Sequence, residues 1–219
     1  MSVRTVLAAV VLALLLTAPC ARAQIPDGGP RVPGARAAIV MEASTGDVLL
    51  SRNPGERRQI ASATKLMTVL VALRHTDLDD IFSATGYDPL PVESQIGLRP
   101  GERMSVRDLL RATLLPSAND AAAAVAESTL GSTEAFVAEM NRLAQSLGLR
   151  DTRFANPIGL DDENNYSSAR DLARLAIELR RYEFFRRTVD LPAATLRSGA
   201  RKRRVINRNA LVRRVDAVD

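Results

Sequence analysis

A serine and a lysine three residues apart are the residues of this sequence whose types and spacing best suit chemistry. Ser62 and Lys65 stand where an apolar helical period begins, so both are expected on one face of a helix. A buried lysine loses its proton more readily and can then accept the proton of a seryl hydroxyl. The pair predicts a serine nucleophile with a lysine base. The other interpretation, Ser62 as a helix cap and Lys65 as a surface residue, stays open.

A second polar pair follows Pro116, between two predicted helices. Ser117 and Asn119 place a hydroxyl and a carboxamide on this loop. Such groups can relay a proton to a leaving amine and hold a peptide carbonyl. Either residue could instead cap the helix that is predicted to start near Asn119.

The usual base of a serine hydrolase is a histidine, and the sequence offers a single one. His75 lies where a helix is predicted to end, a position that favours a cation, so a Ser-His-Asp triad is not expected. Arginine stays protonated and cannot act as a base. Lys65 and Lys202 are the only lysines in the sequence, which makes Lys65 the candidate base.

Periodicity predicts strands first, then a helical block, then more strand. Apolar runs at 37–41 and 48–50 flank turn residues and predict a β-hairpin. Helices are predicted from residue 62, after Ser105, from about 119 to 128, after Ser132 with Gly148 as its cap, and after Ser168. Strand-like segments such as 204–206 return only after residue 191. The order predicts an α+β fold with a helical insertion between parts of one sheet.

With their surroundings, these motifs resemble the serine-type D-alanyl-D-alanine carboxypeptidases, low-molecular-mass penicillin-binding proteins of the peptidase S11 type. Residues 62–65 match the S-x-x-K motif and residues 117–119 match S-x-N. Four longer segments resemble the family's first hairpin, its nucleophile helix and two later stretches: 38–46, 59–68, 156–160 and 166–172. The resemblance extends from about residue 36 to the end. It implies a β-lactamase/penicillin-binding-protein transpeptidase-like fold, an antiparallel sheet with a helical subdomain.

The resemblance also implies a reaction and its residues. Ser62 would form an acyl-ester with the penultimate D-alanine of a peptidoglycan stem peptide ending in D-Ala-D-Ala, and the terminal D-alanine would leave. Lys65 would accept the proton, Ser117 would complete the catalytic group and Asn119 would bind substrate. β-Lactam antibiotics would be covalent inhibitors. No metal ion or organic cofactor is implied.

One motif of the family, K-T-G, is absent from this sequence. Lys202 is followed by Arg203 and Arg204, and the chain is expected to stop just short of that motif. Residues 36–219 are thus expected to be the N-terminal part of the catalytic domain, without the last strands and closing helix. A non-catalytic or truncated relative that binds penicillin or peptidoglycan is the alternative. A class A β-lactamase is less favoured, because no E-x-x-L-N stretch is present and position 118 is Ala.

The N-terminus has the pattern of a signal peptide at 1–23, followed by an extended lead at 24–35. Arg4 precedes the apolar run 6–16, and residues 21–23 read Ala-Arg-Ala, typical of a cleavage site. The run is too short to span a bilayer, so no transmembrane anchor is expected in this chain. Lipidation of Cys20 is the alternative, although Pro19 spoils the usual lipobox. The predicted location is periplasmic, extracellular or wall-associated.

Composition sets limits on the partners. Hydrophobic residues make up 46% of the chain, which is typical of a globular protein. Removing residues 1–23 lowers the formal net charge from +5 to +3, because Arg4 and Arg22 are lost. The remaining excess lies mostly between Arg197 and Arg214 and is expected to form a solvated face. Nucleic acid is not expected as a partner of an exported protein.

Processing at the predicted site can be checked directly. We expect N-terminal sequencing of the secreted protein to begin at Gln24. Recovery of intact Met1 from the cytoplasm would contradict the export hypothesis, and a lipid on Cys20 would replace it with lipoprotein processing.

Overall fold

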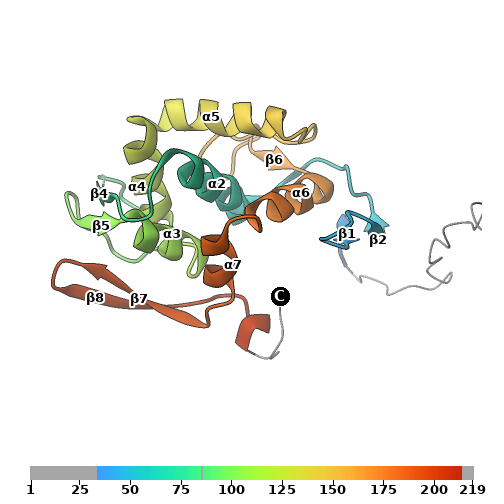
Figure 1. Ribbon diagram of the computed structural model, residues 1–219. Coiled ribbons are helices and arrows are strands. Elements are labelled where there is room, and N and C mark those ends of the chain that lie inside the picture. Colours follow the sequence, from blue (N-terminus) through green and yellow to red (C-terminus); the bar gives the residue numbers. More distant parts are fainter. Residues whose placement is uncertain (1–33, 85, 214–219) are drawn as a thin grey trace, which may run out of the picture. The chain divides into compact units, whose positions relative to one another are not determined.

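The computed structural model describes residues 34–84 and 86–213 (Figure 1). The predicted signal peptide 1–23, most of the lead 24–35 and the residues after 213 lie outside the described residues. Within the described ranges, no helix is both long enough and apolar enough to cross a membrane.

The described chain contains a helical block, as the sequence predicts. Its α-helices are α2 (Lys65–His75), α3 (Val106–Leu114), α4 (Asn119–Leu130), α5 (Thr133–Ser146), α6 (Ala169–Leu179) and α7 (Glu183–Val189). The sequence predicts the starts of α3 to α6, but it does not predict α7. Helix α2 is central, since it packs against α3, α4, α5 and α6 (Figure 1).

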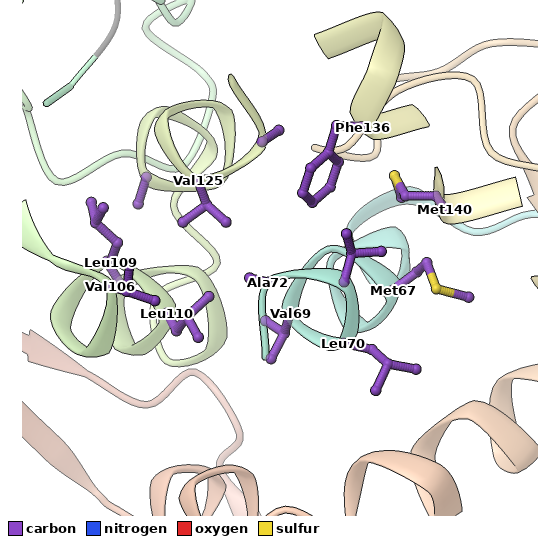
Figure 2. Packing of buried hydrophobic residues seen from close by; sticks show 14 of the residues in the cluster. Met67, Val69, Leu70, Ala72, Val106, Leu109, Leu110, Val125, Phe136 and Met140 are labelled. Atoms are coloured by element: carbon purple, nitrogen blue, oxygen red, sulfur yellow. The ribbon is translucent and has the colours of Figure 1, made fainter. Parts of the chain in front are cut away.

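The core surrounds α2 on several sides. Phe136 and Met140 of α5 point toward Met67, while side chains of α3 and α4 approach Val69 and Ala72 from another side (Figure 2). Every residue of α2 from Val69 to Ala72 is fully buried. Because α2 is enclosed in this way, its first turn is held in a fixed position, and that turn carries Lys65.

Serine side chains start three of the helices. Ser105, Ser132 and Ser168 each accept a hydrogen bond from the backbone N–H three residues on. At Ser105 the cap is one-sided, because its hydroxyl accepts the Asp108 N–H while the Asp108 side chain binds elsewhere. The Asp108 carboxylate instead accepts the backbone N–H of Arg197 at 2.8 Å and pairs with Arg111 of its own helix at 3.2 Å.

The strands form four separate two-stranded antiparallel sheets among the described residues. The pairs are β1 (Ala38–Met41) with β2 (Val48–Arg52), β3 (Arg58–Gln59) with β6 (Tyr166–Ser167), β4 (Ile81–Ser83) with β5 (Arg103–Ser105), and β7 (Ala193–Ser198) with β8 (Arg201–Ile206). The predicted first hairpin is confirmed. The prediction that strands return only after residue 191 is wrong, because β4, β5 and β6 lie before it. These strands have only two or three residues each, so they show no alternating pattern in the sequence.

The arginine-rich segment is not simply the solvated face that its composition indicates. Arg203 on β8 is turned inward, and its guanidinium pairs with Glu102 at 2.6 Å with both side chains only 10% exposed. The hydrogen bond from Arg203 is the main reason that the pKa of Glu102 falls to about 2. This pair joins the β7–β8 hairpin to the segment that leads into β5.

The packing around α2 predicts which side chains contribute most to the free energy of unfolding. Phe136→Ala removes a fully buried ring and should lower the free energy of unfolding by about 3–5 kcal/mol. Val92→Ala, at a side chain that is 92% exposed, should change it by less than about 0.5 kcal/mol. Urea denaturation measures both, and similar losses in the two variants would contradict this description of the core.

Candidate active site

The proposed nucleophile lies in a tight turn that leads into α2. Residues Ala61–Thr64 form a 3₁₀ turn, η1, and the α-helix begins at Lys65. The sequence predicts that Ser62 opens the α-helix itself, and this detail is wrong by three residues. The side chains still converge, because residues three apart overlie one another in a 3₁₀ turn. Ser62 is exposed and Lys65 is only 3% exposed.

Three oxygen atoms surround the Lys65 amine. Nζ donates to Asn119 Oδ1 at 2.6 Å and to the carbonyl oxygen of Ile158 at 2.5 Å. It lies 3.4 Å from Ser62 Oγ, a longer contact. Two of the three neighbours are carbonyl oxygens, which can only accept, whereas the hydroxyl of Ser62 can also donate. A neutral amine would keep its two N–H groups on the carbonyls and turn its lone pair to Ser62.

Burial favours that neutral form. Desolvation is the largest effect on Lys65 and lowers the pKa of its amine from 10.5 to about 8. The charge of Glu93 acts in the opposite direction, and the charge of Arg208 lowers the pKa further. A substantial fraction of the molecules then holds an unprotonated lysine at neutral to mildly alkaline pH. The alternative of Lys65 as a surface residue is excluded by its burial.

A loop from Asn156 to Leu160 supplies the Ile158 carbonyl. The side-chain oxygen of Asn156 accepts the backbone N–H groups of Ile158, Gly159 and Leu160, which folds the loop tightly. Thr68, one turn after Lys65, donates to the carbonyl oxygen of Pro157 at 2.6 Å. Two successive carbonyls are therefore held by the same face of α2.

Gly159 brings this loop against the nucleophile turn. Its φ is +85°, and a Cβ there would lie 2.1 Å from the carbonyl oxygen of Ala61 and 3.0 Å from the backbone nitrogen of Ser62. Only glycine fits such an approach without a shift. The sequence shows this segment solely as part of the family resemblance, since the pattern alone does not reveal which turn it contacts.

The second predicted pair meets the first pair only through Asn119. Its amide oxygen contacts Lys65, as described above, and its side chain is 7% exposed. Among the described residues, Ser117 Oγ is buried without a hydrogen-bond partner. This hydroxyl is an exception among buried polar atoms, which normally have a hydrogen-bond partner.

Two residues of the site are not predicted from the sequence. Glu93 accepts the Asn119 Nδ2 group at 2.6 Å and the Tyr87 hydroxyl at 2.5 Å on the same carboxylate oxygen. Both hydrogen bonds lower the pKa of Glu93, and the bond from Tyr87 has the larger effect. Burial and this hydrogen bond raise the pKa of Tyr87. Neither residue lies in a motif, so only the folded chain shows that they reach Asn119.

Backbone strain is found at the same place. Ala61 has φ 44° and Ser117 has φ 63°, two left-handed conformations that cost a residue with a side chain roughly 1–2 kcal/mol each. Strain of this kind is often kept at functional sites. The two residues flank the Ser62–Lys65 pair from different segments, which supports a site at this point of the fold.

His75 lies at the opposite end of α2 from Lys65. Its Nε2 contacts Glu139 at 3.0 Å, close to Arg142. His75 lies ten residue steps along the helix from Lys65, or about 15 Å along the axis. This position agrees with a role at the helix end and leaves Lys65 as the candidate base beside Ser62.

Solved structures similar to this chain define its class. A D-alanyl-D-alanine carboxypeptidase from Mycobacterium tuberculosis superposes with a TM-score of 0.80 at 31% identity, over 87% of this chain and 74% of that chain. A mutant of a Streptomyces DD-transpeptidase gives 0.80 at 29% identity, over 85% and 79%. Penicillin-binding protein 6B from Escherichia coli gives 0.74 at 32%, over 86% and 62%. The predicted α+β, penicillin-binding-protein transpeptidase-like fold is confirmed.

The chain belongs to the peptidase S11 family of D-alanyl-D-alanine carboxypeptidases, whose profile matches residues 29–219. Similar relatives are the carboxypeptidase DacF of Bacillus subtilis, 38% identical over 191 residues, and a D-alanyl-D-alanine endopeptidase of Pseudomonas aeruginosa, 38% identical over 161. The matches cover 84% and 73% of this chain, but 49% and 52% of the relatives. The chain thus spans about half the length of these relatives.

The contact at Gly159 can be tested with a matched pair of variants. Gly159→Ala and Gly148→Ala both place a methyl group at positive φ, but a Cβ at Gly148 meets no atom within 4 Å. We expect Gly159→Ala to lower the free energy of unfolding by about 1–3 kcal/mol more than Gly148→Ala, because its Cβ must push residues 61 and 62 away. Urea denaturation measures the difference, and equal losses would contradict the close approach.

Proposed function

We propose that this protein is a serine-type D-Ala-D-Ala carboxypeptidase that removes the terminal D-alanine from peptidoglycan stem peptides. The observation that supports this most is the buried Lys65 amine, lowered in pKa and placed beside the exposed Ser62 hydroxyl. Membership of the S11 family supports the choice of substrate. β-Lactams would acylate the same serine.

Acylation begins with transfer of the Ser62 proton to neutral Lys65. Ser62 Oγ attacks the carbonyl carbon of the penultimate D-alanine and forms a C–O bond, and the carbonyl oxygen becomes an oxyanion. Backbone N–H groups and the positive end of the first turn of α2 favour that charge. Asn119 and the Ile158 carbonyl keep the lysine nitrogen directed at Ser62.

Collapse of the oxyanion breaks the peptide C–N bond. The proton held by Lys65 passes to the leaving amine of D-alanine, with the Ser117 hydroxyl as the relay. Water then attacks the ester, gives its proton to Lys65 and releases the shortened peptide, which regenerates Ser62. Every proton that leaves Ser62 or water is returned to a leaving group.

The partners and the location follow from this proposal. The substrate belongs to the bacterial wall, so the protein acts outside the cytoplasm, in agreement with the signal peptide predicted at 1–23. The expected location is periplasmic, extracellular or wall-associated.

Acylation by a fluorescent penicillin tests the proposal. The label should appear on Ser62 alone, and Ser62→Ala should abolish it. Lys65→Arg keeps the charge but removes the base, so labelling should slow by roughly 10³-fold or more. Lys202→Arg makes the same change at the other, exposed lysine and should label like the wild type.

Two results would contradict the proposal. One is a label that survives Ser62→Ala, and the other is a mild effect of Lys65→Arg. Rapid turnover of nitrocefin would instead favour a β-lactamase, and labelling without release of D-alanine from a D-Ala-D-Ala peptide would favour a penicillin-binding relative without turnover.

A further inference from the structure

Glu93 stands out among the residues around the site, because it touches Asn119 but not the proposed nucleophile or base. Its Oε2 accepts the Asn119 amide and the Tyr87 hydroxyl, and its Oε1 accepts the Leu90 backbone N–H at 3.2 Å. The Glu93 carboxylate is therefore bound by Tyr87 and Leu90 of its own loop and by Asn119 of the site.

Asn119 lies between two charged residues, Glu93 and Lys65, and each can bind only one end of its amide. A carboxylate can only accept hydrogen bonds, and a lysine ammonium can only donate them. With Nδ2 on Glu93 and Oδ1 on Lys65, both demands are met, at 2.6 Å each. The flipped amide would place oxygen against carboxylate and NH₂ against the lysine nitrogen.

The consequence of a flip is chemical. An Asn119 NH₂ group directed at neutral Lys65 would donate to the lone pair of Nζ. That lone pair is the one that must accept the proton of Ser62. A flipped Asn119 would therefore compete with the nucleophile for its base.

We propose that Glu93 is a positioning residue that fixes the Asn119 amide, with Tyr87 and Leu90 as its supports, so that the lone pair of Lys65 stays directed at Ser62. This inference rests on the proposed function. It adds a residue that lies outside the S-x-x-K and S-x-N motifs. Glu93 does not touch the reacting atoms and acts through Asn119 alone.

The loop that carries Glu93 is well anchored to α4. The backbone N–H of Asn119 donates to the Ser94 carbonyl at 2.6 Å, and Asp120 accepts the N–H groups of Ile96 and Leu98. Glu93 and Asn119 thus keep their relative position without depending on the contact between their side chains. Loss of the carboxylate should change the site more than it changes the fold.

The test compares Glu93→Gln with Asp88→Asn, which removes an exposed carboxylate from the same loop. Penicillin acylation of Ser62 is measured at about pH 9, where most of the wild-type lysine is neutral. We expect Glu93→Gln to be roughly 10- to 100-fold slower, the effect of one charged hydrogen bond, and Asp88→Asn to match the wild type. If Glu93 acted only through its charge on the Lys65 pKa, the rate at this pH would not change, because Lys65 is mostly neutral in both proteins.

Lysine NMR gives a second readout that does not require activity. Only two lysines are present, so a Lys202→Arg background leaves the Lys65 signal by itself. The charged groups whose fields reach Lys65 are Glu93, which raises its pKa, and Arg208, which lowers it. Removal of the Glu93 charge should therefore move the Lys65 pKa below its wild-type value, whereas Asp88→Asn should leave it in place.

Tyr87→Phe is the milder variant if Glu93→Gln proves unstable in thermal melting. It removes one neutral donor to Glu93 and should slow acylation by about 2- to 10-fold. An unchanged acylation rate in the folded Glu93→Gln variant, or in Tyr87→Phe where that variant fails to fold, would overturn the inference. Absence of acylation in the wild type would overturn the proposed function instead, and the Lys65 titration would still decide whether Glu93 acts on the lysine.

Discussion

The burial of one lysine amine is the constraint on which the rest of this site depends. Lys65 is 3% exposed, and its nitrogen has carbonyl oxygens on two sides and a hydroxyl on the third. An ammonium in such a place loses solvation, so the neutral amine becomes accessible near pH 8. In the neutral form, the same carbonyls would hold the two N–H groups and leave the lone pair to Ser62. Burial therefore supplies both the basicity and the direction that the proposed chemistry needs.

The fold provides this burial with elements that are distant in sequence. Helix α2 is enclosed by four other helices, which fixes its first turn. The loop at 156–160 reaches that turn because Gly159 tolerates a contact that no side chain would allow. Asn119 lies at the start of α4, and Glu93 lies on the loop between β4 and β5. Strain at Ala61 and Ser117 lies where these segments meet, and the packed core around α2 offsets its cost.

The sequence alone predicts the elements that have a clear local pattern, such as a capping serine or an apolar helical period. Serine caps and apolar periods predict α3 to α6, and the spacing of Ser62 and Lys65 predicts their contact. The reasoning fails for short strands such as β4 and β6, which have too few residues for a period. It also fails to predict that the Arg203 side chain points inward, since the basic run 201–204 does not reveal which of its side chains meets Glu102. Glu93 and Tyr87 lie in no motif, and Glu93 contacts Asn119 across 26 residues of sequence.

The central claim is that the free amine of Lys65 activates Ser62. The most direct test is the pH dependence of the rate of Ser62 acylation by a penicillin in the unmodified protein. Because the free enzyme must hold neutral lysine, the second-order rate constant should rise with pH and level off above a midpoint near 8. A rate constant that is flat from about pH 6 to 10, or that rises only toward the ordinary lysine value of 10.5, would contradict the account.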